Sequence, residues 1–559
     1  MPSHTWPYTD DNGQSEDFKP TMTDGVVETD LLIVGAGPAG AALACFLGYH
    51  GLRGMVIAAT PGTADTPRAH VINMAAMECL RDIGLEKECL QVAVKGDAML
   101  HTRWCRTLAG EEYARVYSLG NDPNRAGDYD AASPCSHVDI PQTVLEPILI
   151  NRASHSGFNC RFDTTFLSFE KDSASNTTIS KIQDNLTKQI YHIRSKYLFG
   201  CDGARSQVLR QLQIPLIKKP GGGIAMNVLV RAELGHIMEN RMGNLHCIMR
   251  PDEDTPDYGW TAIARMVKPW NEWMFILSPY PGKDVNPSDE EYLECVKDMI
   301  GDKSVPVELL GVSKWTINET VAEYYSDGNI LERQPVGQSI VTRANQGTRD
   351  HLPIWEALGM MDPSVEIRRK HFAELREATP EGAARRARFQ AGIEGTAREF
   401  HGVGIEMNQR YESSAVFTSD EKPRPPLPMD PILEHEITTY PGSRLPHAWL
   451  NTKVPGKQFS TIDLAGHGKF SLFTGIGGEK WRTSAMKAAE ILGLEISVHS
   501  IGWRQDYEDV YFDWARRREV NESGCVLVRP DRFVAWRSMD MIDVPDEKLL
   551  LVLKTILSR

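Results

Sequence analysis

The sequence predicts an α/β protein in three parts: a parallel-sheet domain, an antiparallel sheet inserted into it and a smaller C-terminal α/β domain. An apolar run, Leu31–Val34, passes through a glycine-rich turn into an alanine-rich helix, which is the pattern of a parallel βα unit. Alternating segments separated by Pro, Asp and Gly follow between residues 223 and 316 and indicate an antiparallel sheet. A proline-rich boundary at 421–428 then precedes a strand, a helix and a hairpin.

The glycine-rich turn has the spacing of a phosphate-binding loop at the start of a Rossmann-like domain. Gly35 allows a sharp turn, Gly37 allows the backbone to approach a pyrophosphate, and Gly40 allows helix and strand to pack closely. The helix Ala41–Tyr49 begins there and presents free N–H groups and the positive end of its dipole to phosphates. The alternative to a phosphate-binding loop is a glycine-rich turn that serves only the packing of the core. The residues predicted to face a dinucleotide are Gly35, Gly37, Pro38, Ala39 and Gly40.

Composition and charge exclude several classes of partner. The chain has 559 residues, enough for about three or four domains. Its 24% charged and 41% hydrophobic residues fit an ordinary soluble globular protein. The net charge of −14 comes without a basic patch, which argues against nucleic acid or an anionic membrane as a partner.

The cysteines and the N-terminal residues support further predictions. The ten cysteines show no CxxC and no metal-ligand spacing, so they predict reduced thiols in a cytoplasmic enzyme and no metal site. Residues 1–28 are polar and lack the apolar core of a signal peptide. We expect them to form a disordered lead-in.

The second predicted strand, Gly54–Ala58, departs from the simplest NAD-binding pattern. A Rossmann unit usually ends this strand on an acidic residue that holds the ribose hydroxyls, whereas this chain continues Ala58-Ala59-Thr60. A loop from Thr66 to Asn73 instead brings Arg68 to the same phosphate region and leads into a predicted helix, Met74–Ile83.

This Thr-Pro-Arg-Ala-His loop resembles a recurring signature of the FAD-dependent aromatic hydroxylases, the group A flavoprotein monooxygenases, and within them the phenol and chlorophenol monooxygenase branch. A Pro-Gln-x-x-Leu-Glu pattern within 136–152 and an Asp-Gly turn within 197–210 support the resemblance. The resemblance places Arg68 and Gln142 at the flavin, and Asp202 beside the pyrophosphate in the cleft that FAD and NADPH share. The alternative for Asp202 is an ordinary Asp-Gly turn.

In that family the inserted sheet, expected here at about 223–316, roofs the substrate over the flavin in a p-hydroxybenzoate hydroxylase-like fold. A phenol reacts better as phenolate, so a hydrogen-bonding side chain is expected in the sheet, and His246 and Tyr258 are the catalytic candidates. Packing inside the sheet is the alternative for the aromatic residues. Further candidates for the pocket lining are Trp260, Arg265, Trp270 and Trp273.

One segment of the family is absent. After the Asp-Gly turn at 327–330 the family continues into a second Gly-Asp motif, which binds the FAD ribityl chain, and then into a glycine-rich loop and a long helix over the flavin. Here Ile330 is followed at once by Leu331–Gly337, which resembles the family sequence after that helix. We infer that one coding block is missing at this junction through a skipped exon or a mispredicted gene model, and we expect weak FAD binding.

The C-terminal part resembles the thioredoxin-like C-terminal domain of phenol hydroxylases, on the order of its strand, helix and hairpin. Without a CxxC it cannot carry out dithiol chemistry, so we expect a structural role and a surface for a homodimer. The expected boundaries are a lead-in at 1–28, an FAD-binding domain at 29–420 that includes the sheet, and the thioredoxin-like domain at 421–559.

The resemblance implies a monooxygenase that takes hydride from NADPH or NADH, uses O₂ and hydroxylates a phenolic or other electron-rich aromatic substrate through a flavin C4a-hydroperoxide. Phenol catabolism and secondary metabolite biosynthesis both stay open. Two alternatives remain. One is a catalytically impaired paralogue or truncated gene product that acts only as a binding protein. The other is a flavin reductase or dehydrogenase that does not activate oxygen.

Overall fold

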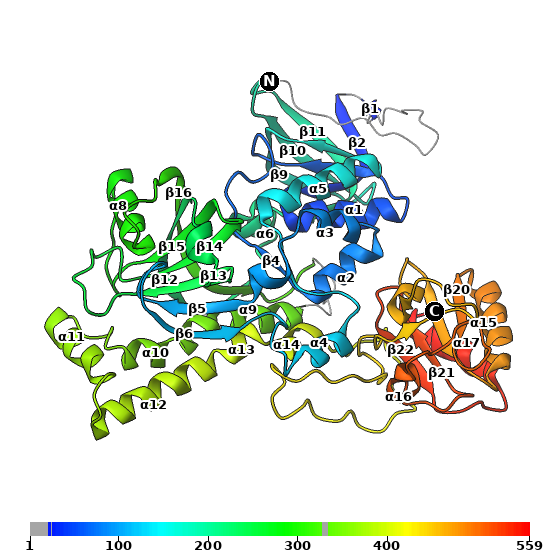
Figure 1. Ribbon diagram of the computed structural model, residues 1–559. Helices are drawn as coiled ribbons and strands as arrows, with labels where there is room; N and C mark the ends of the chain where they lie inside the picture. The colour runs from blue at the N-terminus through cyan, green and yellow to red at the C-terminus, as the bar shows by residue number, and fades with distance from the viewer. Residues whose placement is uncertain (1–20, 24, 327–333) are drawn as a thin grey trace.

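The first sheet carries the predicted βα unit (Figure 1). The computed structural model describes residues 21–23, 25–326 and 334–559. The strand order of this sheet is β8-β3-β2-β11-β10-β9, with β1 paired to β2, and β8, β3, β2 and β11 are mutually parallel. The strands are β1 Thr21–Thr23, β2 Val26–Val34, β3 Gly54–Ile57, β8 Phe158–Arg161, β9 Thr164–Asp172, β10 Thr177–Asp184 and β11 Ile190–Gly200.

The predicted lead-in is longer than the structure supports. Residues 21–23 form β1, and β2 begins at Val26, which already pairs with His192 of β11. Val27 is buried in the core on one face of the sheet, so its burial favours an early start of the strand. The boundary expected at residue 29 is therefore too late. Residues 1–20 of the lead-in lie outside the described residues.

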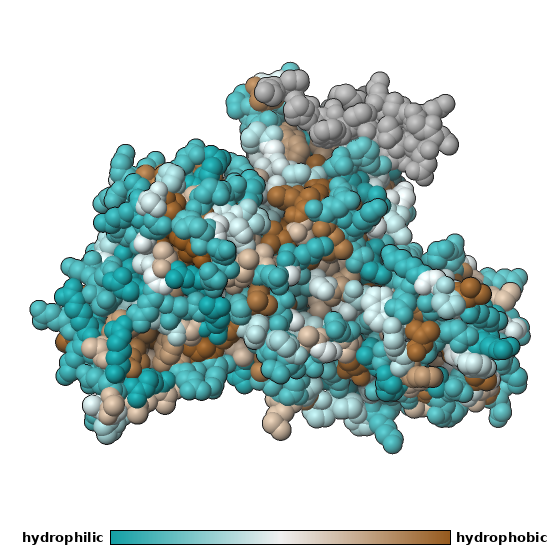
Figure 2. Space-filling model, viewed as in Figure 1, coloured by the Kyte–Doolittle hydropathy of each residue, from teal (hydrophilic) through white to brown (hydrophobic). Residues whose placement is uncertain are grey.

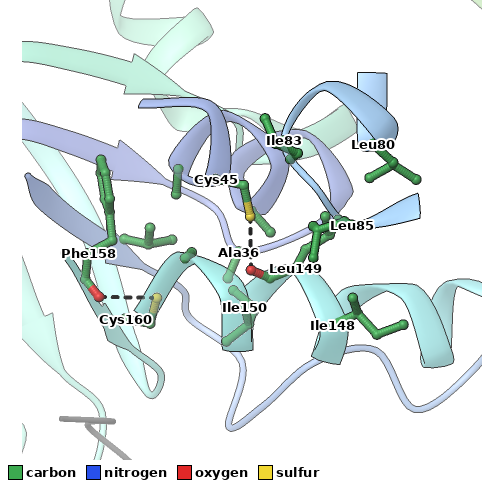
Figure 3. Packing of buried hydrophobic residues seen from close by; sticks show 14 of the residues in the cluster. Ala36, Cys45, Leu80, Ile83, Leu85, Ile148, Leu149, Ile150, Phe158 and Cys160 are labelled. Carbon is green, nitrogen blue, oxygen red and sulfur yellow. Dashed lines mark hydrogen bonds between the residues drawn. The ribbon is translucent and has the colours of Figure 1, made fainter. Parts of the chain in front are cut away.

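Two helices, α1 (Pro38–Tyr49) and α5 (Gln142–His155), pack against each other on one face of this sheet. Figure 3 shows the contact, in which the thiol of Cys45 donates a hydrogen bond to the Leu149 carbonyl oxygen at 3.1 Å. Both residues are buried together with Ile33 of β2 and Phe158 of β8. Each such apolar side chain contributes about 1.5–3 kcal/mol when fully buried, so this packing holds the start of α1 in place. The neighbouring helices are α2 Met74–Asp82, α3 Glu86–Val92 and α6 Gln207–Leu212.

The inserted antiparallel sheet contains the four predicted strands and three more. Its order is β16-β12-β15-β14-β13-β5-β6. The segment 101–117 supplies β5 and β6, and β5 pairs in parallel with β13. These two strands lie outside the range of about 223–316 that the sequence predicts for the sheet, because the pairing joins strands far apart in the chain. The strands are β5 His101–Cys105, β6 Glu112–Tyr117, β12 Leu216–Arg231, β13 Leu245–Met249, β14 Thr261–Lys268, β15 Glu272–Ser278 and β16 Glu308–Ala322.

Helices cover the two faces of the inserted sheet differently. On one face, α8 (Asp289–Ile300) packs over Ile248, Ala264 and Trp273. On the other face, Trp104, Cys247 and Met249 pack under a group of helices later in the chain. Side chains alternate between faces along each strand, so neighbours in sequence meet different surroundings. The later helices are α9 Gln334–Asp350, α10 Leu352–Ala357, α11 Val365–Glu374, α12 Pro380–Gly395, α13 Ala397–Phe400 and α14 Val403–Met407.

The C-terminal domain has the thioredoxin-like topology that the sequence predicts. Its four strands have the order β20-β19-β21-β22, with β20 parallel and β21 antiparallel to β19. Buried side chains of α15 and α17, such as Trp481 and Leu549, pack with Leu527 of β21. Within the described residues, no helix is long and apolar enough to cross a membrane. The elements are β19 Phe470–Thr474, α15 Glu479–Leu492, β20 Ile496–Ser500, β21 Cys525–Val528, β22 Val534–Ser538 and α17 Pro545–Ile556.

Candidate functional site

The turn after β2 depends on two of its glycines for close backbone contact. Gly35 has a φ of +108°, and a Cβ added there would lie 2.2 Å from the carbonyl oxygen of Cys201. A Cβ on Gly40 would lie 1.9 Å from the carbonyl oxygen of Gly35. No side chain fits at either position. The glycines therefore bring the start of α1 directly against the end of β11.

The third glycine of the turn faces open space. Gly37 is the N-cap of α1, and no side chain caps this helix end within the described residues. A Cβ on Gly37 would meet a single atom within 4 Å, the Glu146 Oε1 at 3.8 Å. Pro38 occupies the first turn, so the free donors there are the N–H groups of the next residues, Ala39 and Gly40. An uncapped helix start beside open space fits the phosphates of a dinucleotide.

Asp202 lies where the prediction expects it, beside this turn. Its backbone nitrogen is 2.9 Å from the Cβ position of Gly35. Its carboxylate accepts hydrogen bonds from the Ser206 hydroxyl at 2.6 Å and from the Gln207 N–H at 2.6 Å. The Asp202 side chain therefore supports the start of α6, whose N-cap is Ser206, and this is compatible with the Asp-Gly turn alternative. A role toward a cofactor remains a prediction.

Gln142 and a residue that the sequence prediction missed, Glu146, lie opposite Gly37. Glu146 is 3% exposed, and its Oε1 accepts a hydrogen bond from the side-chain amide of Gln142 at 2.5 Å. Its Oε2 accepts from the backbone N–H of Ala64 at 2.6 Å. The two side chains are four residues apart on α5, a spacing that puts them on one face of the helix. The Pro-Gln-x-x-Leu-Glu pattern already contains this four-residue spacing, so it could have pointed to Glu146 as a partner of Gln142.

Arg68 lies on an exposed loop that is tied to the start of α5. The backbone N–H of Gln142 donates to the carbonyl oxygen of Ala69 at 2.9 Å. Arg68 therefore directly precedes Ala69, which is hydrogen-bonded to α5, the helix whose Glu146 faces Gly37. The structure brings the predicted residues into one region, although no contact joins the Arg68 guanidinium to the turn within the described residues.

The same loop joins the first domain to the inserted sheet through His70. Its Nδ1 lies 3.4 Å from Oδ1 of Asp139, whose Oδ2 accepts a hydrogen bond from Asn244 Nδ2 at 2.8 Å. Asn244 directly precedes β13. Burial lowers the pKa of His70, so its imidazole is neutral at neutral pH. His70 and Asp139 stand in two segments that the sequence singled out, yet neither was predicted as a site residue.

Arg265 lies on the sheet face that looks away from α8. It alternates along β14 with Ala264 and Met266, which belong to the core under α8. Burial lowers the pKa of the Arg265 guanidinium, and the charges of Asp139 and Glu399 act against that shift. Arg265 is a partly buried cation on the sheet face that the later helices cover.

His246 lies on the opposite face, fully enclosed. Nη1 of Arg103 donates to its Nδ1 at 3.1 Å, so the proton is on Nε2, which donates to the Gly243 carbonyl oxygen at 3.0 Å. Burial, followed by the charge of Arg103, lowers the pKa of His246 to about 3. Both ring nitrogens are therefore used in holding the sheet together. Its catalytic role remains a prediction that this geometry does not support.

Tyr258 and the predicted tryptophans mainly pack. The Tyr258 ring lies 6.2 Å from that of Tyr292 on α8, on the same side of the sheet as His246. The Trp260 indole donates to the Met360 carbonyl oxygen at 3.2 Å. Trp273 is 0% exposed and stacks on Trp270 with ring centroids 6.2 Å apart. These contacts agree with the packing alternative.

Two family models match the chain. Residues 28–331 match the model described as an FAD binding domain, and residues 438–559 match the one described as the C-terminal part of aromatic-ring hydroxylases. The first match covers more than half of the chain. The chain belongs to the FAD-dependent aromatic-ring hydroxylases.

Curated relatives in this family align over almost their whole length. The chain is 36% identical to a 2,4-dichlorophenol 6-monooxygenase of Delftia acidovorans, over 95% of this chain and 99% of the relative. It is also 36% identical to a phenol 2-monooxygenase of Pseudomonas sp. strain EST1001, over 97% of this chain and 95% of the relative.

Two solved structures show the same architecture. The flavin-dependent monooxygenase PieE, in complex with FAD and substrate, is 34% identical with a TM-score of 0.89, over 95% of this chain and 99% of that one. An aklavinone-11 hydroxylase, in a ternary complex with FAD and aklavinone, is 23% identical with a TM-score of 0.72, over 96% of this chain and 100% of that one. The second likeness supports the fold alone.

The alignment with the Delftia hydroxylase is longer than the chain itself. It extends over 584 positions, while the chain has 559 residues. Some positions of the relative therefore have no counterpart in this chain. The predicted junction at Ile330–Glu332 lies outside the described residues.

Proposed function

We propose that this chain is an NAD(P)H-using, FAD-dependent monooxygenase that hydroxylates a phenolic or other electron-rich aromatic ring. The observation that carries the proposal is the open, uncapped start of α1 at Gly37, in a chain of the aromatic-ring hydroxylase family. Close relatives in that family are named as monooxygenases of phenol and chlorophenol.

When bound, FAD supplies the redox chemistry: it accepts hydride from NAD(P)H and delivers one atom of O₂ to the ring. The residues of the chain bind the cofactor and hold the surrounding segments in position. The N–H groups of Ala39 and Gly40 bind phosphate, and Arg68 adds a positive charge from the neighbouring loop. Gln142 and Glu146 hold that loop and the start of α5 in register.

The aromatic substrate is proposed to enter between the first domain and the inserted sheet. Figure 2 shows hydrophobic atoms gathered on this side of the molecule, over the region of α5 and α6 in Figure 1. Exposed apolar surface beside polar groups is typical of a binding region for rings. A relative from Streptomyces halstedii that is 28% identical and named "Putative polyketide hydroxylase" supports a role in secondary metabolism beside the catabolism of phenols.

A direct assay tests the proposal. Purified chain is mixed with FAD, NADPH or NADH and a panel of phenols and polycyclic phenols, and O₂ uptake is measured with product analysis by mass spectrometry. We expect substrate-dependent O₂ uptake and a product heavier by one oxygen atom. NAD(P)H oxidation without oxygen in the product would select the flavin reductase or dehydrogenase.

A flavin-free binding protein is the second candidate function, and two observations favour it. The strand β3 runs into Ala58, where an acidic residue would hold the ribose of the cofactor. The alignment also shows that the Delftia relative has positions that this chain lacks. A purified chain that stays colourless with excess FAD, yet binds a phenol in calorimetry, would select this candidate.

Location and assembly are the remaining parts of the proposal. We propose a cytoplasmic enzyme, supported by ten cysteines without a CxxC pattern. We propose that the C-terminal domain contributes to a homodimer. Sedimentation of the purified chain tests the assembly, and fractionation of the source cells tests the location.

A further inference from the structure

A cavity of about 460 Å³ lies beside α2 in the first domain. Its walls come from α2, α3 and α4 (Ala126–Ala132), and from segments around residues 95–99, 119–121 and 134–138. Among the described residues that line it, none was proposed above for FAD or for the substrate. Sites for small molecules have volumes of about 300–1,000 Å³, so the cavity is large enough for a molecule of one or two rings.

The cavity lies on the far side of β7 (Val138–Asp139) from the inserted sheet. Successive side chains along a strand point to opposite faces. Val138 lines the cavity, whereas Asp139 accepts a hydrogen bond from Asn244, which directly precedes β13. No strand of the inserted sheet contributes to the described lining. The cavity is therefore separate from the region between the first domain and that sheet.

Methionines form much of the apolar wall. Met74 and Met77 of α2 and Met99 all line the cavity and are buried. Leu90 of α3 adds a partly buried apolar side chain. Methionine is unbranched and polarisable, so it adapts to ligands of different shape and makes favourable sulfur contacts with aromatic rings. This wall therefore suits an aromatic ring.

Tyr129 of α4 brings a hydroxyl group without a protein partner to the cavity. Tyr129 lines the cavity and is 7% exposed, and no described residue forms a hydrogen bond with its hydroxyl. Gly120 holds the ring in place, since a Cβ there would lie 3.1 Å from two ring atoms. Burial, followed by the charge of Glu406, raises the pKa of Tyr129, so the hydroxyl keeps its proton. A buried hydroxyl without a partner is costly, and a polar ligand would satisfy it.

His137 brings a matching acceptor to the same wall. Its Nε2 donates to Oε2 of Glu406 on α14 at 2.8 Å. The carboxylate thereby fixes the proton on Nε2, so Nδ1 of the neutral imidazole is an acceptor. In the described part of the chain, Nδ1 forms no hydrogen bond. The His137 and Tyr129 rings meet edge to face with centroids 5.6 Å apart, and both line the cavity.

The charged side chains of the lining have both signs. Lys95 and Asp130 are exposed, and neither forms an ion pair with another described residue. The remaining carboxylate of the lining, Glu86, pairs with Arg81 at 2.8 Å. A cleft concentrates ionic ligands when charges of one sign line it. This mixed lining therefore favours an uncharged molecule.

We propose that this cavity binds an uncharged hydroxylated aromatic molecule of one or two rings, at a site separate from the proposed substrate region. The hydroxyl group of the ligand donates to Nδ1 of His137 and accepts from the hydroxyl of Tyr129, while its rings lie against the methionines. No bond is formed or broken at this site. It does not rest on the proposed function, because binding there needs neither FAD nor oxygen.

The probe for the test is 2-naphthol, titrated by calorimetry into the full chain with FAD present and without NAD(P)H, so that no turnover occurs. The titration is made at about pH 8, where an ordinary imidazole is neutral. We expect a dissociation constant below about 1 mM. Tyr129→Phe removes one oxygen atom and should weaken binding about five- to tenfold. The ether 2-methoxynaphthalene cannot donate to His137 and should bind the wild type about tenfold more weakly.

Leu90→Trp and its matched control Val92→Trp locate the binding event. Both variants place the same ring on α3, but Leu90 lines the cavity, whereas Val92 is 47% exposed and lies outside the lining. Leu90→Trp should fill the cavity and weaken one 2-naphthol binding event at least about tenfold. Val92→Trp should bind like the wild type. Thermal melting shows whether each variant is folded, and Tyr129→Phe keeps the shape of the wild type.

Three results would overturn the proposal: no binding of 2-naphthol up to its solubility limit, no binding event weakened by Leu90→Trp, or no effect of Tyr129→Phe on that event. Its failure is distinct from a failure of the proposed function. A chain that hydroxylates phenols but binds 2-naphthol equally well with Leu90→Trp would keep the proposed function and remove this site. A chain that hydroxylates no phenol but loses the binding event in Leu90→Trp and Tyr129→Phe would do the opposite.

Discussion

Arg81 of α2 and Asp463 of the C-terminal domain form a two-point ion pair across the domain boundary. Arg81 Nε donates to Asp463 Oδ1 at 2.7 Å, and Nη2 donates to Oδ2 at 2.8 Å. Arg532 of the same domain donates to Asp82 of α2 at 2.7 Å. Because α2 follows the Arg68 loop, the C-terminal domain holds the helix next to the loop that carries the predicted cofactor residue.

Asp463→Asn should weaken this domain contact. Loss of hydrogen bonds to a charged group, at a site where both side chains are partly buried, costs about 1.5–3 kcal/mol. Urea unfolding followed by tryptophan fluorescence measures the change. Asp30→Asn is the matched control, since Asp30 pairs with Lys196 on an exposed surface and should show no measurable change. Equal effects of both variants would refute the importance of the boundary pair.

Acid should remove the same contribution. Burial alone raises the pKa of Asp463, but its hydrogen bond with Arg81 and other partners outweigh burial and hold the pKa below the ordinary 3.8. A depressed carboxyl pKa stabilises the fold fully above the unfolded value and loses this effect as pH falls through the folded value. The stability difference between wild type and Asp463→Asn should therefore be constant from pH 7 to about 5 and shrink below about pH 4. A difference that persists unchanged at acid pH would contradict this.

Gly37→Ala and Gly40→Ala should have different effects. A Cβ on Gly37 meets only one atom at 3.8 Å, so this variant should keep its melting temperature while FAD binding weakens by about tenfold or more. A Cβ on Gly40 would lie 1.9 Å from the Gly35 carbonyl oxygen, so that variant should lose about 1–3 kcal/mol of stability or more. Fluorescence quenching of FAD and thermal melting measure the two quantities. If Gly37→Ala left the FAD affinity unchanged, the turn would not face the phosphates.

Arg68→Ala, in a form of the chain that binds flavin, should weaken FAD by about 1.5–3 kcal/mol, because a charge-assisted hydrogen bond to phosphate is lost. This is roughly a ten- to hundredfold rise in the dissociation constant. Arg388→Ala, at an exposed position of α12, is the control. Unchanged affinity in Arg68→Ala would show that the guanidinium faces elsewhere.

The junction near residue 330 carries the last prediction. We expect the genomic interval between the codons for Ile330 and Glu332 to contain an in-frame segment that encodes a strand end, a Gly-Asp motif, a glycine-rich loop and an amphipathic helix. Described residues on both sides support this, since Tyr325 is 42% exposed and Ile340 of α9 is 52% exposed. Sequencing of the interval and its transcript tests the gene.

The shortened chain itself should bind FAD poorly, because it lacks a partner for the ribityl hydroxyls. The measurement is the absorbance of the purified 559-residue chain after gel filtration with excess FAD. A yellow chain with one FAD per protein molecule would contradict the expectation, and continuous coding across the junction would show that the shorter form is genuine.

Local patterns were enough to predict much of this fold from the sequence. The run Leu31–Val34, its glycine turn and the helix after it are contiguous, so their spacing alone predicts a βα unit. The alternating strands and the C-terminal order of strand, helix and hairpin are local in the same sense. Gln142 and Asp202 were predicted differently, from the resemblance of their segments to family motifs, and their role toward a cofactor stays a prediction.

Tertiary structure decided what depends on strand register and long-range contact. The parallel pairing of β5 with β13 brings residues 101–105 into a sheet that the local pattern placed at about 223–316. A shift of register by one residue exchanges the two faces of a strand, so sequence could not tell whether His246 or Arg265 faces the later helices. The approach of Glu399 to Gly347 joins two helices that are separated in the chain, and only folding creates it.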